Sequence, residues 1–146
     1  MIAEQDLALR LENQLCFAVH SAAHAFARAY KPLLDPLDLT YPQYLVLLQL
    51  WEQDGRTVSE LGGPLFLDSG TLTPLLKRME RAGLLSRSRD KIDERLVRVR
   101  LTPKGSAIRE KARGFPAAMG CLTGLDEAQA TSLRKALTGI GASLRT

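Results

Sequence analysis

Hydrophobic residues recur with a helical period along most of this chain. Residues 7–30 contain neither proline nor glycine, and their apolar side chains would cover more than one side of a helix. This pattern is typical of a helix that is buried against several partners. Pro32 and Pro36 are expected to end this helix, and Thr40-Tyr41-Pro42 then predicts the start of a second helix that reaches Trp51.

Two shorter helices are predicted in tandem after a turn. The first begins in the run 57–60, where a threonine is followed three residues later by a glutamate, as in a capping box, and it extends toward Leu65. The second begins at Asp68-Ser69-Gly70-Thr71, with Pro74 expected in or close to its first turn because proline cannot donate the backbone hydrogen bond. Gly83 is expected to end it. Its core-facing residues have the spacing i, i+3, i+4, i+7 and are Leu72, Leu75, Leu76 and Met79.

The hydrophobic period changes to two after Gly83. Residues 85–89 alternate, a polar turn follows, and residues 96–101 alternate again. This pattern predicts a β-hairpin with one apolar and one largely basic face. Arg98 and Arg100 are expected to be solvated side chains on the basic face.

The last part of the chain is predicted to be helical. Thr102-Pro103 opens a helical region with a weak point at Gly114-Phe115-Pro116, and a final helix is expected from Asp126 to Leu144. Aromatic residues make up only 5% of the chain, which favours helices over a β-sandwich. The predicted fold class is therefore mainly α with a small β-hairpin wing, a winged helix-turn-helix, in a single domain of residues 1–146.

The positive charge of the chain is concentrated in one segment. The net charge is +4, but residues 77–100 hold nine basic and four acidic residues, whereas the rest holds eleven basic and twelve acidic ones. A solvated helix face could explain such a charge run alone. The order of the elements and the small polar residues Thr71 and Thr73 favour double-stranded DNA, with the second tandem helix in the major groove and the hairpin on the adjacent backbone or minor groove.

Nothing in the sequence predicts export or membrane insertion. No apolar run approaches the roughly 20 residues that span a bilayer. The N-terminal MIAEQDLALR carries acidic residues and no apolar signal core, so the protein is expected in the cytoplasm. Cys16 and Cys121 lie 105 positions apart, with no Cys-x-x-Cys pair. In a reducing cytoplasm they are expected to be thiols at rest.

Several segments resemble a known family. The stretch 39–105 resembles the MarR-type winged-helix regulators. Within that family, LENQLCFAV at 11–19, AYKPLLDPL at 29–37 and FLDSGTLTPLLKRME at 66–80 look like the organic hydroperoxide resistance regulator branch. The wing sequence Asp-x-x-Asp-Glu-Arg is typical of the wider family, whereas Leu-Glu-Asn-Gln-Leu-Cys is more specific to the peroxide-sensing branch. The resemblance is strong over residues 10–112.

The resemblance implies a homodimer that binds a palindromic operator. Residues 1–35 and 103–146 would supply the dimerisation helices, and residues 40–102 the DNA-binding lobe. Arg95 would enter the minor groove, with Asp93 holding its side chain. The other residues expected to contact DNA, on the recognition helix and the first strand of the wing, are Ser69, Gly70, Thr71, Thr73, Pro74, Lys77, Arg78, Arg87 and Arg89.

The resemblance also implies a redox chemistry. Cys16 matches a cysteine whose thiolate attacks organic hydroperoxides to give a sulfenic acid, and Tyr30 and Tyr41 match tyrosines that hydrogen-bond the cysteine of the other subunit. His20 stands where relatives often carry another tyrosine, one helical turn after the cysteine, and would either stabilise the thiolate when protonated or simply pack. Cys121 resembles the second cysteine of the two-cysteine type, which forms an intersubunit disulfide with Cys16. The alternative for Cys121 is a small apolar residue in a glycine-rich stretch.

Other functions are open to the same residues. Cys16, His20 and His24 fall on one helix face and could bind zinc, which would make the chain a metal-responsive repressor. Binding of aromatic acids between the helices is a second alternative. An enzyme such as a thiol peroxidase is not expected, because there is no thioredoxin-like βαβ frame and the basic wing would be unexplained. The sequence thus predicts a DNA-binding repressor without a metal, a cofactor or a catalytic site.

Overall fold

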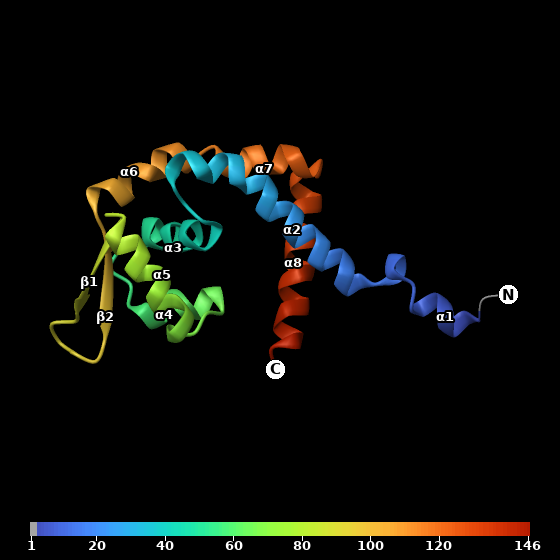
Figure 1. Ribbon diagram of the computed structural model, residues 1–146, viewed down its shortest axis with the longest axis horizontal. Coiled ribbons are helices and arrows are strands. Elements are labelled where there is room, and N and C mark those ends of the chain that lie inside the picture. Colours follow the sequence, from blue (N-terminus) through green and yellow to red (C-terminus); the bar gives the residue numbers. More distant parts are fainter. Residues whose placement is uncertain (1–2) are drawn as a thin grey trace. The chain divides into compact units, whose positions relative to one another are not determined.

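The computed structural model describes residues 3–146, and it confirms the predicted fold class, mainly α with one antiparallel β-hairpin (Figure 1). The described residues divide into two compact units, whose boundary in the sequence lies between Ile108 and Arg109. In chain order the elements are α1 Glu4–Ala8, η1 Leu11–Asn13, α2 Leu15–Leu34, η2 Asp35–Leu37, α3 Tyr41–Glu52, α4 Val58–Leu65, α5 Ser69–Arg81, β1 Leu85–Arg89, β2 Val97–Leu101, α6 Pro103–Ala112, α7 Phe115–Thr123 and α8 Glu127–Leu144.

The core of the first unit is formed by α3, α4, α5 and the hairpin. Helix α3 contacts both α4 and α5, and α5 also contacts β1. All four residues of the apolar stripe predicted on α5 are buried, so that prediction is confirmed. Each fully buried aliphatic side chain stabilises the fold by roughly 1.5–3 kcal/mol. The large side chains with the least exposure are Val46, Leu47, Leu50, Leu61, Leu72, Leu76, Met79, Leu85 and Val99.

The helices of this core begin at the caps that the sequence predicts. At the start of α3, Thr40 Oγ1 accepts from the Gln43 N–H at 3.4 Å, and Gln43 Oε1 accepts from the Thr40 N–H at 3.1 Å. Thr57 and Glu60 make the same reciprocal pair at α4, and Asp68 caps α5. Because each cap satisfies backbone donors that the helix leaves unpaired, its loss costs about 0.5–2 kcal/mol.

The N-terminal region differs from the prediction of one helix over residues 7–30. The helix is interrupted at residues 9–14, between α1 and α2. Two side chains explain the break: Asn13 Nδ2 and Gln14 Nε2 donate to carbonyl oxygens at the end of α1, at 2.7 and 2.6 Å. Such side-chain bonds give the backbone an alternative to the helix. Cys16 consequently lies in the first turn of α2 instead of the middle of a long helix.

Three prolines lie inside helices: Pro32 in α2, Pro64 in α4 and Pro74 in α5. Helix α2 continues through Pro32 to Leu34, so the predicted end at this proline is wrong. Pro32 removes only one backbone N–H close to the helix end, which limits its cost. Pro74 is the sixth residue of α5 and lies in its second turn, next to the first turn and therefore close to the place that the sequence predicts. The Gly70 carbonyl four residues earlier lies on an exposed residue, where water can replace the missing donor.

The predicted hairpin is confirmed. Strands β1 and β2 pair antiparallel, with Leu85 opposite Leu101 at the base. Val99 is fully buried, and its N–H donates to the carbonyl oxygen of Arg56, before α4, at 2.8 Å. The wing, which we define as β1, β2 and the loop 90–96 between them, is therefore attached to the connection between α3 and α4 by a backbone hydrogen bond.

The second unit contains α7 and α8. The predicted weak point corresponds to the interruption between Ala112, where α6 ends, and Phe115, where α7 begins. Gly124 ends α7 with a φ of +70°, a left-handed conformation that glycine adopts without strain. The final helix begins one residue after Asp126, which forms a capping box with Gln129. The predicted start of that helix is confirmed.

Candidate DNA-binding surface and thiol site

The outer face of α5 carries the residues predicted to contact DNA. Thr73 is half-buried, and the other predicted residues of this helix are exposed on the side opposite the buried stripe. Lys77 and Arg78 supply positive charge, and the smaller residues in the first two turns allow close approach of a nucleic acid. Their contact with DNA stays a prediction. The residues of this face are Ser69, Gly70, Thr71, Thr73, Pro74, Lys77 and Arg78.

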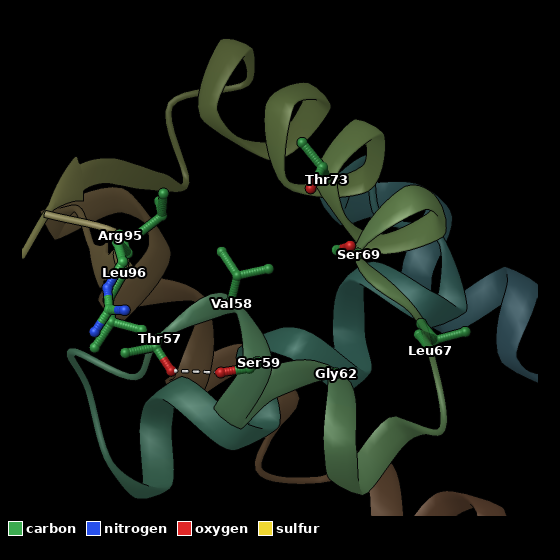
Figure 2. A pocket seen from close by; sticks show the side chains of 10 residues that line it. Thr57, Val58, Ser59, Gly62, Leu67, Ser69, Thr73, Arg95 and Leu96 are labelled. Atoms are coloured by element: carbon green, nitrogen blue, oxygen red, sulfur yellow. Dashed lines mark hydrogen bonds between the residues drawn. The ribbon is translucent and has the colours of Figure 1, made fainter.

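A groove of about 530 Å³ lies between α5 and the wing. Figure 2 shows Ser69 and Thr73 of α5 on one side and Arg95 and Leu96 of the wing on the other, with residues 57–59 at the start of α4 between them. The two predicted DNA-contacting elements therefore border one shared hollow in the first unit.

The wing arginine is held by its neighbour and remains open to solvent. Arg95 Nε and Nη2 donate to the two carboxylate oxygens of Asp93, at 3.0 and 3.1 Å. The hydrogen bonds from the Arg95 side chain and backbone hold the pKa of Asp93 below its usual range. The Asp93 carboxylate therefore orients the Arg95 guanidinium. The Arg95 side chain is nevertheless 90% exposed, so it remains accessible to a partner. The pairing implied by the resemblance is present, and its role on DNA stays a prediction.

The two arginines of β1 are engaged within the protein. Arg87 Nη2 pairs with Glu80 at 3.2 Å, and the Arg87 backbone N–H donates to the same carboxylate at 2.7 Å, which holds the pKa of Glu80 below its usual range. Arg87 Nε is buried and has no hydrogen-bond partner among residues 3–146. Arg89 Nη1 donates to the carbonyl oxygen of Glu94 at 2.8 Å, and its side chain is exposed. Arg89 is thus more accessible to a phosphate than Arg87.

Arg98 is not the solvated side chain that the strand pattern predicts. Its guanidinium donates to the carbonyl oxygen of Gly55 and to the carboxylate of Asp90, and only 28% of the side chain is exposed. Arg100, two positions further on, is exposed as expected. Periodicity could not distinguish the two arginines, because the Gly55 partner lies 43 residues away in the sequence.

Cys16 is the second residue of α2 and is exposed in the single chain. The unpaired backbone N–H groups in the first turn of a helix attract negative charge. Reactive cysteines are commonly found in such electropositive, accessible places. His20 follows one turn later on the same face, and its ring centroid lies 4.5 Å from that of His24.

The two predicted tyrosines lie together at the other end of α2. The ring centroids of Tyr30 and Tyr41 are 4.8 Å apart, and Tyr44 joins them at 5.8 Å from Tyr30. No motif in the sequence indicated Tyr44, although it is three residues after Tyr41 on α3 and so shares its helix face. Burial, together with the neighbouring tyrosines, raises the pKa of Tyr30 to about 12. Tyr30 therefore keeps its proton, and its ability to donate, at any physiological pH.

The raised pKa of Tyr30 predicts a pH dependence of stability. The unfolded chain releases this proton near the ordinary pKa of 10.0, whereas the folded chain holds it to about 12. The free energy of unfolding should therefore fall as the pH rises from 10 to 12, and Tyr30→Phe should make that fall shallower. Denaturant titrations of both proteins measure the difference, which should not change with pH below 10. Parallel curves up to pH 12 would contradict the shift.

Cys121 lies in the last turn of α7 and is exposed in the single chain.

No group of three or more His, Cys, Asp or Glu side chains within residues 3–146 is arranged to hold a metal ion. None of the helices within residues 3–146 is both long enough and apolar enough to cross a bilayer.

Comparison with known proteins identifies the family. A model of the transcriptional regulator SarA/Rot family matches residues 28–112. The organic hydroperoxide resistance transcriptional regulator of Bacillus subtilis (strain 168) is 46% identical over 138 residues, which are 94% of this chain and 92% of that relative. The chain belongs to the MarR-type family of winged-helix transcriptional regulators. It is a DNA-binding regulator and not an enzyme.

Two further proteins resemble this MarR-type regulator. The HTH-type transcriptional regulator TtmR of Methylorubrum extorquens (strain PA1) is 57% identical over 122 residues, or 82% of the chain, which spans 63% of that relative's length. The structure of reduced AbfR bound to DNA, a protein of Staphylococcus epidermidis, has 34% identity and a TM-score of 0.77, and the match covers 97% of this chain and 99% of AbfR. The disulfide form of AbfR also has 34% identity, with a TM-score of 0.64, over 93% and 96% of the two chains.

Proposed function

We propose that this MarR-type regulator is a homodimeric repressor that acts in the cytoplasm and leaves its operator when an organic hydroperoxide oxidises Cys16. The observation that carries the proposal is the place of Cys16. It stands in the segment LENQLC, whose asparagine and glutamine side chains interrupt the helix and leave the cysteine in the first turn of α2. The relative that matches 94% of the chain is named for organic hydroperoxide resistance.

Two exposed apolar faces support a homodimer. Large apolar side chains that gather on one side of a helix mark an interaction surface. We therefore propose residues 1–35 and 103–146 as the dimerisation elements and residues 40–102 as the DNA-binding lobe. The exposed apolar residues that share a helix face are Leu15, Val19 and Phe26 on α2, and Leu133, Leu137, Ile140 and Leu144 on α8.

The proposed role of the tyrosines requires the second subunit. Tyr30 follows Cys16 by fourteen residues in the same helix, which separates them by about 21 Å along the helix axis. A hydrogen bond needs about 3 Å between donor and acceptor. Tyr30 and its neighbour Tyr41 would therefore donate to the Cys16 thiolate of the partner subunit, and the raised pKa of Tyr30 keeps this donor protonated.

The proposed sensing reaction begins at the Cys16 sulfur. The thiolate attacks the terminal oxygen of the hydroperoxide, the O–O bond breaks, and the alkoxide leaves and takes up a proton to become an alcohol. The sulfur is thereby oxidised by two electrons to a sulfenic acid, and the peroxide is reduced. The Cys121 thiol of the other subunit then attacks the sulfenic sulfur, water leaves, and a disulfide forms.

The positions of the two cysteines in their helices support this division of roles. Cys16 lies in the first turn of α2, where the helix dipole favours negative charge, whereas Cys121 lies in the last turn of α7, where the dipole disfavours it. A disulfide between subunits would alter the spacing of the two recognition helices. That spacing has to match half-sites about 34 Å apart, so oxidation would lower operator affinity.

Arg95→Ala tests the DNA-binding part of the proposal. The variant should bind a duplex that the wild-type protein selects from a randomised library about 5-fold to 150-fold more weakly, because a desolvated groove contact is lost. Lys77→Ala removes an exposed charge of α5 and should weaken binding evenly across sequences and lower the salt slope by about one. Titrations at several salt concentrations measure both effects. Unchanged affinity in both variants would contradict the proposed DNA surface.

The response is tested by adding candidate signals to the protein–DNA complex. A lipophilic hydroperoxide should release the duplex, and dithiothreitol should restore binding if a disulfide has formed. Zinc and aromatic carboxylic acids are added in parallel as the alternative signals. Release by one of these, with no response to hydroperoxide, would assign the chain to a metal-responsive or ligand-responsive regulator instead.

A further inference from the structure

Arg98 connects two segments that the sequence places far apart. Its Nη1 donates to the carbonyl oxygen of Gly55, in the turn between α3 and α4, at 2.6 Å, and its Nη2 donates to Asp90 Oδ2 at 2.8 Å. The side chains of Arg98 and Asp90 are only 28% and 13% exposed. Gly55 has a φ of +76°, which turns the chain sharply at this point. The guanidinium therefore ties the first residue of the wing loop to the helix-turn-helix.

Asp90 connects the Arg98 guanidinium to the backbone of the wing loop through hydrogen bonds. Its second carboxylate oxygen accepts from the Ile92 N–H at 3.0 Å, and its own N–H donates to the carbonyl oxygen of Leu96 at 2.8 Å, which closes the loop. The hydrogen bond from Arg98, followed by that from Ile92, holds the pKa of Asp90 below its usual range, so the carboxylate is charged at neutral pH. The negative charge of Asp90 also acts on Asp93, the residue that holds Arg95.

We propose that Arg98 is a positioning residue of the wing, which sets the place of Arg95 relative to α5 through Asp90 and the loop 90–96. This inference rests on the proposed contact of Arg95 with DNA. Without the Arg98 guanidinium, Asp90 would lose its ion pair, and the link from Asp90 to the carbonyl oxygen of Gly55 would be broken. Arg98 itself has its guanidinium engaged within the protein and need not contact DNA.

The chain offers a matched control for the loss of charge. Arg100 lies in the same strand, two residues after Arg98, and is exposed. Arg98→Gln and Arg100→Gln therefore remove the same charge from the same strand, but only the first breaks the link between Gly55 and Asp90. Asp90→Asn serves as a second variant at the other end of the link, in case Arg98→Gln does not fold. Thermal unfolding followed by circular dichroism checks that each variant is folded.

The experiment is a double-mutant cycle on DNA binding, with full-length protein and the duplex selected by the wild type. Arg98→Gln should weaken DNA binding at least about 5-fold, which is within the range expected for Arg95→Ala. It should also lose the base-pair preferences that Arg95→Ala loses where the wing contacts the duplex. The two changes combined should weaken binding little more than Arg95→Ala alone, because both act through one contact. Arg100→Gln should keep those base-pair preferences.

The possible failures are distinguishable. If Arg95→Ala weakens binding while folded Arg98→Gln and Asp90→Asn bind like the wild type, the positioning role is wrong and the DNA contact stands. The positioning role would also be wrong if the fold-losses in DNA affinity of Arg98→Gln and Arg95→Ala multiply in the double variant. The same holds if Arg100→Gln loses as much affinity as Arg98→Gln. No effect of Arg95→Ala would instead remove the proposed contact on which the inference rests.

Discussion

With Cys16 replaced by serine, the reduced regulator is expected to bind its selected duplex within about twofold of the wild type and to remain bound when hydroperoxide is added. The small effect on affinity follows because a hydroxyl is nearly the same size as a thiol, and because Cys16 lies outside residues 40–102, the proposed DNA-binding lobe. The complete loss of response follows because a hydroxyl oxygen cannot be oxidised to a sulfenic acid. Fluorescence anisotropy of labelled duplex, before and after hydroperoxide, measures both.

The control for Cys16→Ser is the behaviour of the remaining thiol. Cys121 is also exposed in the single chain, so the same oxidant can reach a second thiol in the Cys16→Ser variant. Mass spectrometry of the treated variant should find far less added oxygen than in the wild type, because Cys121 lies at the end of α7 where negative charge is disfavoured. A Cys16→Ser protein that still leaves the DNA with peroxide would place the sensor elsewhere in the chain.

Cys121→Ser is expected to abolish the cross-linked dimer that hydroperoxide produces in the wild type. On non-reducing gels the oxidised wild type should migrate as a dimer and return to the monomer with dithiothreitol. The variant should stay monomeric on the gel, because the sulfenic acid on Cys16 has no thiol with which to condense. Prolonged oxidation should then carry Cys16 to the sulfinic acid, which dithiothreitol does not reverse, and mass spectrometry detects the second oxygen.

The double variant Cys16→Ser/Cys121→Ser is the matched control for the gel and should remain monomeric under every condition. The informative contrary outcome lies in the wild type itself. If hydroperoxide releases the DNA while every chain remains monomeric, and Cys121→Ser switches reversibly, the regulator is a one-cysteine sensor. Cys121 would then be a packing residue near the end of α7, and the rest of the proposed function would stand.

Local patterns in the sequence were sufficient to predict the helices and strands of residues 40–102, the proposed DNA-binding lobe. The period of α5, the change to period two in the wing, the N-cap at Thr40 and the capping box at Thr57 depend on residues within one helical turn or one strand. Such signals can be seen in the sequence because the interacting side chains are near neighbours in the chain. Arg95 and Asp93, two residues apart, belong to the same class, and their contact was implied by the family resemblance.

The break before α2 shows where local signals compete. The apolar residues of 7–30 predict one helix buried against several partners, but the side chains of Asn13 and Gln14 bind the end of α1 instead of allowing the helix to continue. Residues 15–28 are exposed in the single chain, so their predicted burial stays a prediction. The sequence contains both preferences, and periodicity alone cannot decide between them. The outcome matters for the proposed function, because it places Cys16 in the first turn of a helix.

The sequence by itself determined the order of the elements, the buried face of α5 and the concentration of positive charge in one segment. Only the tertiary structure decided which of those charges are accessible. Arg95 and Arg98 look alike in the sequence, yet one is 90% exposed and the other is enclosed between Gly55 and Asp90. The reason is that Gly55 precedes Arg98 by 43 residues, so their contact arises only when the turn between α3 and α4 packs beside β2.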